Sequence, residues 1–158
     1  MYIVYYDSGT TNTRAYLIKD GRIAGRLERQ GGARNSALMQ DNAVLVRELR
    51  DMFDALLEDA HIYNEEVAHI YLSGMISSPS GLVEVEHLPV PVDWKKLRNS
   101  IVCHEEERFF QRMLEIIPGI KTVPYDAQVV PETGCGGKKS RFSGCCAGIR
   151  SLNRGGVS

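Results

Sequence analysis

A run of alternating strand and turn signals at the N-terminus constrains the fold more than any other feature. Residues 2–6 are apolar and rich in strand-forming residues, which predicts a buried strand. A short polar turn follows at 7–13, and residues 14–19 predict a second strand. The Asp20-Gly21 pair is a strong hairpin signal, after which residues 22–29 predict a third strand. The chain therefore begins with an antiparallel meander whose first turn is polar.

Helix and strand signals alternate further along the chain. Apolar residues recur at helical spacing from about 42 to 61, with Asp41 or Asn42 as the capping residue. Residues 67–72 predict a strand that ends in a second polar loop. Residues 82–92 predict an extended segment, and a helix is expected at 94–102 with Asp93 as its cap. A further helix is expected at 104–114, where the charge run 105–108 would form a solvated face. Residues 115–123 predict a strand that is broken by a Pro-Gly turn. Together they predict an α/β fold with a mixed sheet and helices packed on it.

Composition places the chain among ordinary globular proteins. It has 158 residues, of which 43% are hydrophobic and 25% charged, enough for one domain with a core. The net charge of -1, the absence of a long apolar run and the lack of a signal-like N-terminus predict a cytoplasmic protein that binds neither nucleic acid nor membrane. After residue 133 the chain becomes rich in Gly and Cys and loses all periodicity. We therefore expect a lobe at 1–133 followed by a poorly ordered tail at 134–158.

The first polar turn has the residue types that phosphate binding needs. Phosphoryl transfer requires backbone amides and hydroxyls around the phosphates and a carboxylate that holds the waters of a magnesium ion. Asp7 supplies a carboxylate, Gly9 permits close backbone approach, and short polar residues follow at 10–13. An ordinary hairpin loop uses the same residue types, so both interpretations stay open. Arg14 is either a cation near a phosphate or acidic sugar, or a surface arginine at the strand edge.

The second polar loop, 73–78, lies after another strand, where ligands gather in open α/β sheets. It predicts either one side of a substrate pocket or a plain connection. Three stretches in this order resemble one family, the 2-dehydro-3-deoxygalactonokinases. Residues 6–17 are similar to that family's first phosphate motif, residues 73–81 and 88–91 to its Gly-Met-x-x-Ser segment and proline-bearing strand, and residues 116–119 to a third signature. The resemblance covers about residues 1–125.

This resemblance implies a ribonuclease-H-like, actin-like ATPase lobe. It also implies phosphorylation of the 6-hydroxyl of 2-dehydro-3-deoxy-D-galactonate in galactonate breakdown, with ATP and Mg²⁺ as cofactors and a site between two lobes. The residues that would face phosphate are Asp7, Gly9, Thr10, Thr11 and Asn12, with Asp7 also binding Mg²⁺ through water. Those that would face the acidic sugar are Arg14, Gly74, Met75 and Ser77.

The chain departs from the family after the third signature. Members are longer and carry a Met-Arg-Gly-Glu-Glu segment that is absent here, a pattern that an internal deletion or a frameshift would each produce. The lobe that would hold adenosine is then missing, and no residue is a convincing general base. We expect little turnover by this chain alone, and a homodimer is the candidate oligomer. The alternatives are another kinase of the same fold, a nucleotide-binding regulator, or a non-catalytic remnant.

Overall fold

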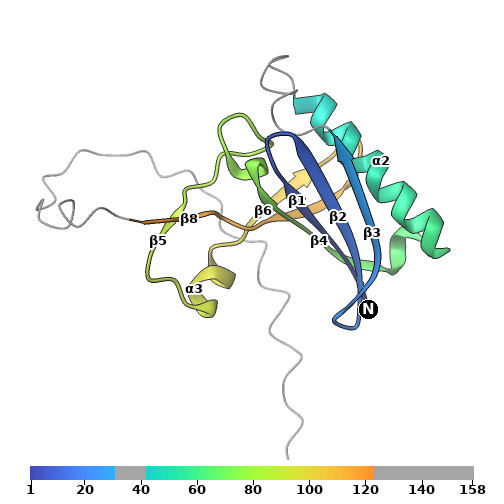
Figure 1. The fold of residues 1–158 in the computed structure, drawn as a ribbon, viewed down its shortest axis with the longest axis horizontal. Coiled ribbons are helices and arrows are strands. Elements are labelled where there is room, and N and C mark those ends of the chain that lie inside the picture. The colour runs from blue at the N-terminus through green and yellow to red at the C-terminus, as the bar shows by residue number, and fades with distance from the viewer. Residues whose placement is uncertain (31–41, 123–158) are drawn as a thin grey trace, which may run out of the picture. The chain divides into compact units, whose positions relative to one another are not determined.

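The N-terminal meander is present as predicted. The structure, a computed structural model, describes residues 1–30 and 42–122 of the chain (Figure 1). Strands β1 (Tyr2–Ser8), β2 (Asn12–Lys19) and β3 (Arg22–Gln30) pair antiparallel in sequence order. Asp20 and Gly21 both have positive φ, 49° and 80°, as a two-residue hairpin turn of matching twist requires.

Three later strands extend the meander into one mixed sheet. Strand β4 (Val67–Gly74) runs parallel to β1, and β7 (Arg112–Ile116) runs parallel to β4. Strand β6 (Val102–Glu106) closes the far edge antiparallel to β7. The strand order is β3-β2-β1-β4-β7-β6, so β1 lies at the centre with its C-terminal end beside that of β4. The mixed α/β architecture predicted from the sequence is confirmed.

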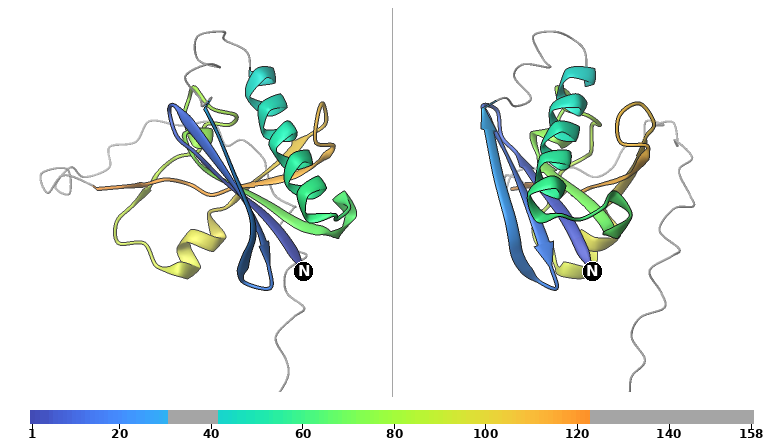
Figure 2. Two further views of the ribbon diagram at one scale, coloured as in Figure 1. Left: turned by 45° about the vertical axis from the view of Figure 1, so that its right-hand side comes forward. Right: turned by 90° about the vertical axis from the view of Figure 1, so that its right-hand side faces the viewer.

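Helix α2 (Asn42–Ala60) covers one face of this sheet, as Figure 2 shows from two sides. The predicted helix at 42–61 is confirmed, while Asp41 lies outside the described residues. The helix buries one apolar stripe against the sheet, and the Tyr6 hydroxyl donates a 2.9 Å hydrogen bond to the Leu49 carbonyl. The core consists of side chains from both layers, among them Val4, Leu17, Leu45, Phe53, Ile70, Leu72, Leu114 and Ile116. Alternation along the strands then leaves polar and aromatic side chains on the opposite face.

The predicted helix at 104–114 is wrong, because this segment forms β6, a turn and β7. The charged run is good helix-forming sequence, but β7 gains more by pairing with β4 in the middle of the sheet. Glu106 is buried rather than part of a solvated face, since its side chain is 2% exposed. Its carboxylate accepts hydrogen bonds from the backbone amides of Phe109 and Phe110 at 2.8 and 3.0 Å, which holds the turn.

The connection between β4 and β6 contains only short elements. A 3-10 helix at Met75–Ser77 follows β4, and β5 (Leu88–Pro89) pairs parallel with β8 (Ile120–Lys121). Helix α3 (Trp94–Asn99) is capped by Asp93 as predicted, although it ends earlier than residue 102. None of the described helices has the length and apolar character needed to cross a membrane. The predicted tail at 134–158 and the boundary before it lie outside the described residues.

Candidate functional site

The first polar loop is a tight turn between β1 and β2. The backbone amide of Gly9 donates to the Asn12 carbonyl at 2.8 Å, which closes the turn. A Cβ atom at Gly9 would lie 3.1 Å from that same carbonyl oxygen, so glycine fits where a larger residue would crowd the turn. Below the turn, the buried hydroxyls of Ser8 and Thr13 lie 3.3 Å apart across the two strands. The base of the loop is therefore fixed.

The tip of this loop has free hydrogen-bonding groups. Thr10 and Thr11 are exposed, and their backbone amides have no partner within the described part of the chain. The side chain of Asp7, one position before the buried Ser8, is 46% exposed. Two unpaired amides and an accessible carboxylate at one strand end are the donor and acceptor set that a magnesium-bound phosphate requires. Gly9 differs from the prediction in one respect, since its own amide is used inside the turn.

The second polar loop lies directly against the first. In the parallel pair of β1 and β4, Asp7 is opposite Ser73 and Ser8 is opposite Gly74. Gly74 has φ 82° and ψ -137°, a conformation that other residues rarely adopt. A Cβ atom there would overlap the carbonyl oxygen of Ser8, so this glycine permits the close approach of the two backbones. The structure thus brings together two loops that are far apart in sequence.

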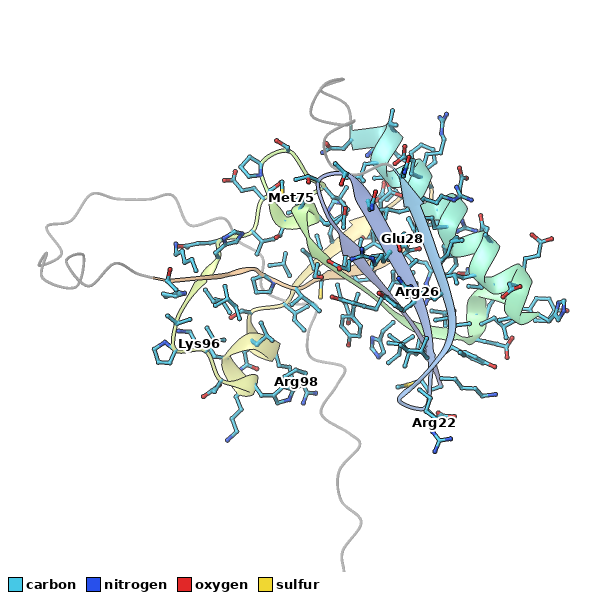
Figure 3. The ribbon with its side chains drawn as sticks, in the orientation of Figure 1. Arg22, Arg26, Glu28, Met75, Lys96 and Arg98 are labelled. Carbon is cyan, nitrogen blue, oxygen red and sulfur yellow. The ribbon has the colours of Figure 1, made fainter. Side chains whose placement is uncertain are left out.

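Met75 and Ser77 differ in how they are placed. Met75 is half-buried and lies at the same end of the sheet as the first loop (Figure 3). Ser77 is buried, and its hydroxyl donates a 2.9 Å hydrogen bond to the Gly74 carbonyl. The Ser78 hydroxyl similarly donates to the Met75 carbonyl at 2.7 Å. These two serines therefore stabilise the loop from within, and contact of Met75 or Ser77 with a substrate stays a prediction.

Arg14 lies between two carboxylates on the sheet face opposite α2. Its guanidinium is 3.8 Å from Asp7 on β1 and 3.3 Å from Glu28 on β3. The hydrogen bond to Glu28 raises the pKa of Arg14, and the same bond lowers the pKa of Glu28. Sequence analysis did not identify Glu28 as part of the site. The hairpin register set at Asp20-Gly21 would place Leu27 opposite Arg14. A register shift between Leu17 and Ile18 brings Glu28 there instead, and no local sequence signal indicates that shift.

Among the described residues, Asp7 carries the carboxylate that lies where the two loops meet, opposite Ser73 on β4. Within residues 1–30 and 42–122, no group of three or more His, Cys, Asp or Glu side chains gathers closely enough to bind a metal directly. A single carboxylate suits Mg²⁺, which keeps several of its waters and shares its remaining ligands with phosphate oxygens. The residues present therefore fit a magnesium–nucleotide complex better than a metal bound by protein ligands alone.

Comparison with known proteins identifies the family. A crystal structure of a Sinorhizobium meliloti protein assigned to the 2-dehydro-3-deoxygalactonokinases superposes with a TM-score of 0.57 and 18% sequence identity, over 79% of this chain. This chain spans 37% of the length of that one. The structure of the Aquifex aeolicus PPX-GPPA enzyme matches over 75% of this chain and 36% of that chain, at 13% sequence identity. Its TM-score of 0.39 is too low to support an argument.

No curated protein matches the sequence significantly. The family model of the 2-keto-3-deoxy-galactonokinases, in contrast, matches residues 7–130. This range includes both loops, the last two residues of β1 and the described strands from β2 to β8. The Sinorhizobium structure agrees with this match in fold. On that evidence the chain belongs to the 2-keto-3-deoxy-galactonokinase family.

Proposed function

We propose that this chain forms the phosphate-binding wall of a cytoplasmic kinase that transfers a phosphoryl group from ATP to the 6-hydroxyl of 2-dehydro-3-deoxy-D-galactonate, in galactonate catabolism. One observation carries this proposal: the contact between Ser8 and Gly74, which sets a loop with free amides beside a second polar loop. A phosphate donor and a small polar acceptor need adjacent binding surfaces of this kind. Family membership supports the kinase class, and the family's description supports the choice of sugar acid.

Each residue of the first loop has a distinct proposed role. Asp7 would hold Mg²⁺ through coordinated water, and the amides of Thr10 and Thr11 would donate to phosphate oxygens. The backbone of Gly9 shapes the turn, while Asn12 borders it at the start of β2. Bound Mg²⁺ would supply neutralisation of the charge that develops on the phosphate oxygens during transfer. The chain's own contribution is positioning, which requires the tight turn already described.

The second loop and Arg14 would face the sugar acid. The guanidinium of Arg14 can pair with a carboxylate, and it lies next to the first loop. Gly74 and Met75 would border the substrate from the end of β4, and Ser77 would shape this border through its hydrogen bond to Gly74. A sugar acid bound here would lie close to the phosphates held by the first loop.

The opposite wall of the cleft is proposed to come from the part of the family fold that lies outside the 37% of the related structure spanned by this chain. A general base must lie within hydrogen-bonding reach of the sugar hydroxyl, and Asp7 is better placed for the metal. We therefore expect this chain to bind ligands weakly and to turn over little, because closure of both walls normally completes such a site.

Two measurements on the purified chain test the proposal. Calorimetric titration with Mg-ATP and with 2-dehydro-3-deoxy-D-galactonate should show binding of each, and the gluconate-derived epimer should bind more weakly. A coupled assay for ADP release should show little turnover. Robust turnover would contradict the single-wall account, and failure to bind Mg-ATP would contradict the kinase assignment. Binding of Mg-ATP without any affinity for either sugar acid would instead identify a nucleotide-binding regulator.

A further inference from the structure

Glu28 is the centre of a polar network on β3, the strand that pairs with β2 at one end of the sheet order. Its Oε1 atom accepts from Arg14 Nη2 at 3.3 Å and from Asn12 Nδ2 at 3.4 Å. Its Oε2 atom accepts from Arg26 Nη2 at 3.2 Å, and Figure 3 shows Arg26 and Glu28 together on β3. One carboxylate thus holds Asn12 of the predicted phosphate set, Arg14 of the predicted sugar-acid set, and Arg26, which belongs to neither.

The register of the sheet links this network to Asp7. Glu28 is opposite Arg14 across β3 and β2, and Arg14 is opposite Asp7 across β2 and β1. Residues that are directly opposite share a face, so the three charges form one row. Within the row, Arg14 lies 3.3 Å from Glu28 and 3.8 Å from Asp7, which makes Glu28 its nearer partner.

The position of Arg14 decides how much negative charge Asp7 presents. A guanidinium in full contact with Asp7 would neutralise the carboxylate and occupy the oxygens that hydrated Mg²⁺ needs. A guanidinium held toward β3 leaves those oxygens accessible. We propose that Glu28 is a positioning residue that acts through Arg14, drawing its guanidinium toward β3 so that Asp7 remains available to the magnesium–nucleotide complex. The inference rests on the proposed function of Asp7 and adds a residue to it.

The expected effect is modest, because the three side chains are 36–46% exposed. Exposed ion pairs contribute little to affinity, so the expected change is about 1.4-fold to fivefold. Glu28→Gln keeps the shape of the side chain and removes its charge. Arg14 should then turn toward Asp7, so that Mg-ATP binds about 1.4-fold to fivefold more weakly. ATP without Mg²⁺ should bind equally well or more tightly, since the site has lost one negative charge.

A double-mutant cycle distinguishes positioning from a general loss of structure. Calorimetry would measure the affinity for Mg-ATP and for ATP in EDTA in four proteins: wild type, Glu28→Gln, Arg14→Met and the double variant. If Glu28 acts through Arg14, Glu28→Gln should have no further effect once Arg14 is replaced. Glu105→Gln is the matched control, because Glu105 is an exposed carboxylate on β6 at the other edge of the same sheet.

Each outcome decides a different point. A fall in the ratio of Mg-ATP to ATP affinity in Glu28→Gln, absent in the Arg14→Met background and in Glu105→Gln, would support the positioning role. Equal losses for both ligands, or additive effects of the two substitutions, would overturn it while leaving the proposed function intact. A wild-type protein that fails to bind Mg-ATP would overturn the proposed function and the positioning role with it.

Discussion

Replacing Gly74 with alanine tests the contact between the two loops. Two costs are expected in the free energy of unfolding. The first is backbone strain, since φ 82° with ψ -137° is costly for a residue with a side chain and adds about 1–3 kcal/mol. The second is steric, because the new Cβ atom would overlap the carbonyl oxygen of Ser8 and force the strands apart, which adds about 1–3 kcal/mol.

Gly21→Ala is a control that separates these costs. Gly21 also has positive φ, at 80°, but a Cβ atom there would meet no atom within 4 Å. Its substitution should therefore show the strain alone, about 1–3 kcal/mol. The difference between the two variants then measures the steric cost of separating Ser8 from Gly74, together with any extra strain from the Gly74 ψ of -137°.

Urea unfolding followed by circular dichroism gives the free energy of unfolding for both variants, provided that the slopes agree. Gly74→Ala should be less stable than Gly21→Ala by about 1–3 kcal/mol. Equal losses in the two variants would refute the close approach of β1 and β4 at this point. The two loops would then not be joined into one site by this contact.

Two further substitutions test the packing that supports the site. Glu106→Gln should lower the free energy of unfolding by about 1–3 kcal/mol, because its carboxylate accepts two backbone hydrogen bonds in a buried position, whereas the exposed neighbour variant Glu107→Gln should change it little. Burial alone would raise the pKa of Glu106, but these hydrogen bonds outweigh it and leave the pKa below its usual value. The ionised carboxylate thus stabilises the folded protein above the unfolded pKa of about 4.3. This contribution is lost as the pH falls from there through the lower folded pKa, so the free energies of unfolding of wild type and Glu106→Gln should converge in acid. Tyr6→Phe should cost about 1 kcal/mol in the same assay through loss of the bond to Leu49, and no loss would contradict that bond.

Local signals were sufficient for the meander and the long helix. The residues of the Asp20-Gly21 turn and of the apolar strand before Asp7 are sufficient to predict these two elements without distant contacts. Helix α2 is predicted by the helical spacing of its apolar residues. The segment 104–114 could not be predicted in the same way. Its residues favour a helix locally, and they form strands because β7 pairs with β4, which is remote in sequence.

The candidate site was predicted only in part, because its assembly also depends on pairing between strands that are remote in sequence. The residues of each loop were recognisable, but the contact of Ser8 with Gly74 depends on the parallel pairing of β1 and β4. Glu28 was missed because its relation to Asp7 passes through the registers of two strand pairs. The inward orientation of Ser77 depends on a turn whose geometry follows from Gly74, and residue type alone did not indicate it.

The central claim is that Asp7 and its loop bind a magnesium–nucleotide complex, and the effect of Asp7→Asn on Mg-ATP binding tests it most directly. Asp20→Asn is the control, since Asp20 lies at the opposite end of β2 in an ion pair with the N-terminal amine. Wild type and Asp20→Asn should both bind ATP more tightly with Mg²⁺ than in EDTA, and Asp7→Asn should lose this gain. Retention of the full magnesium-dependent gain in Asp7→Asn would contradict the claim.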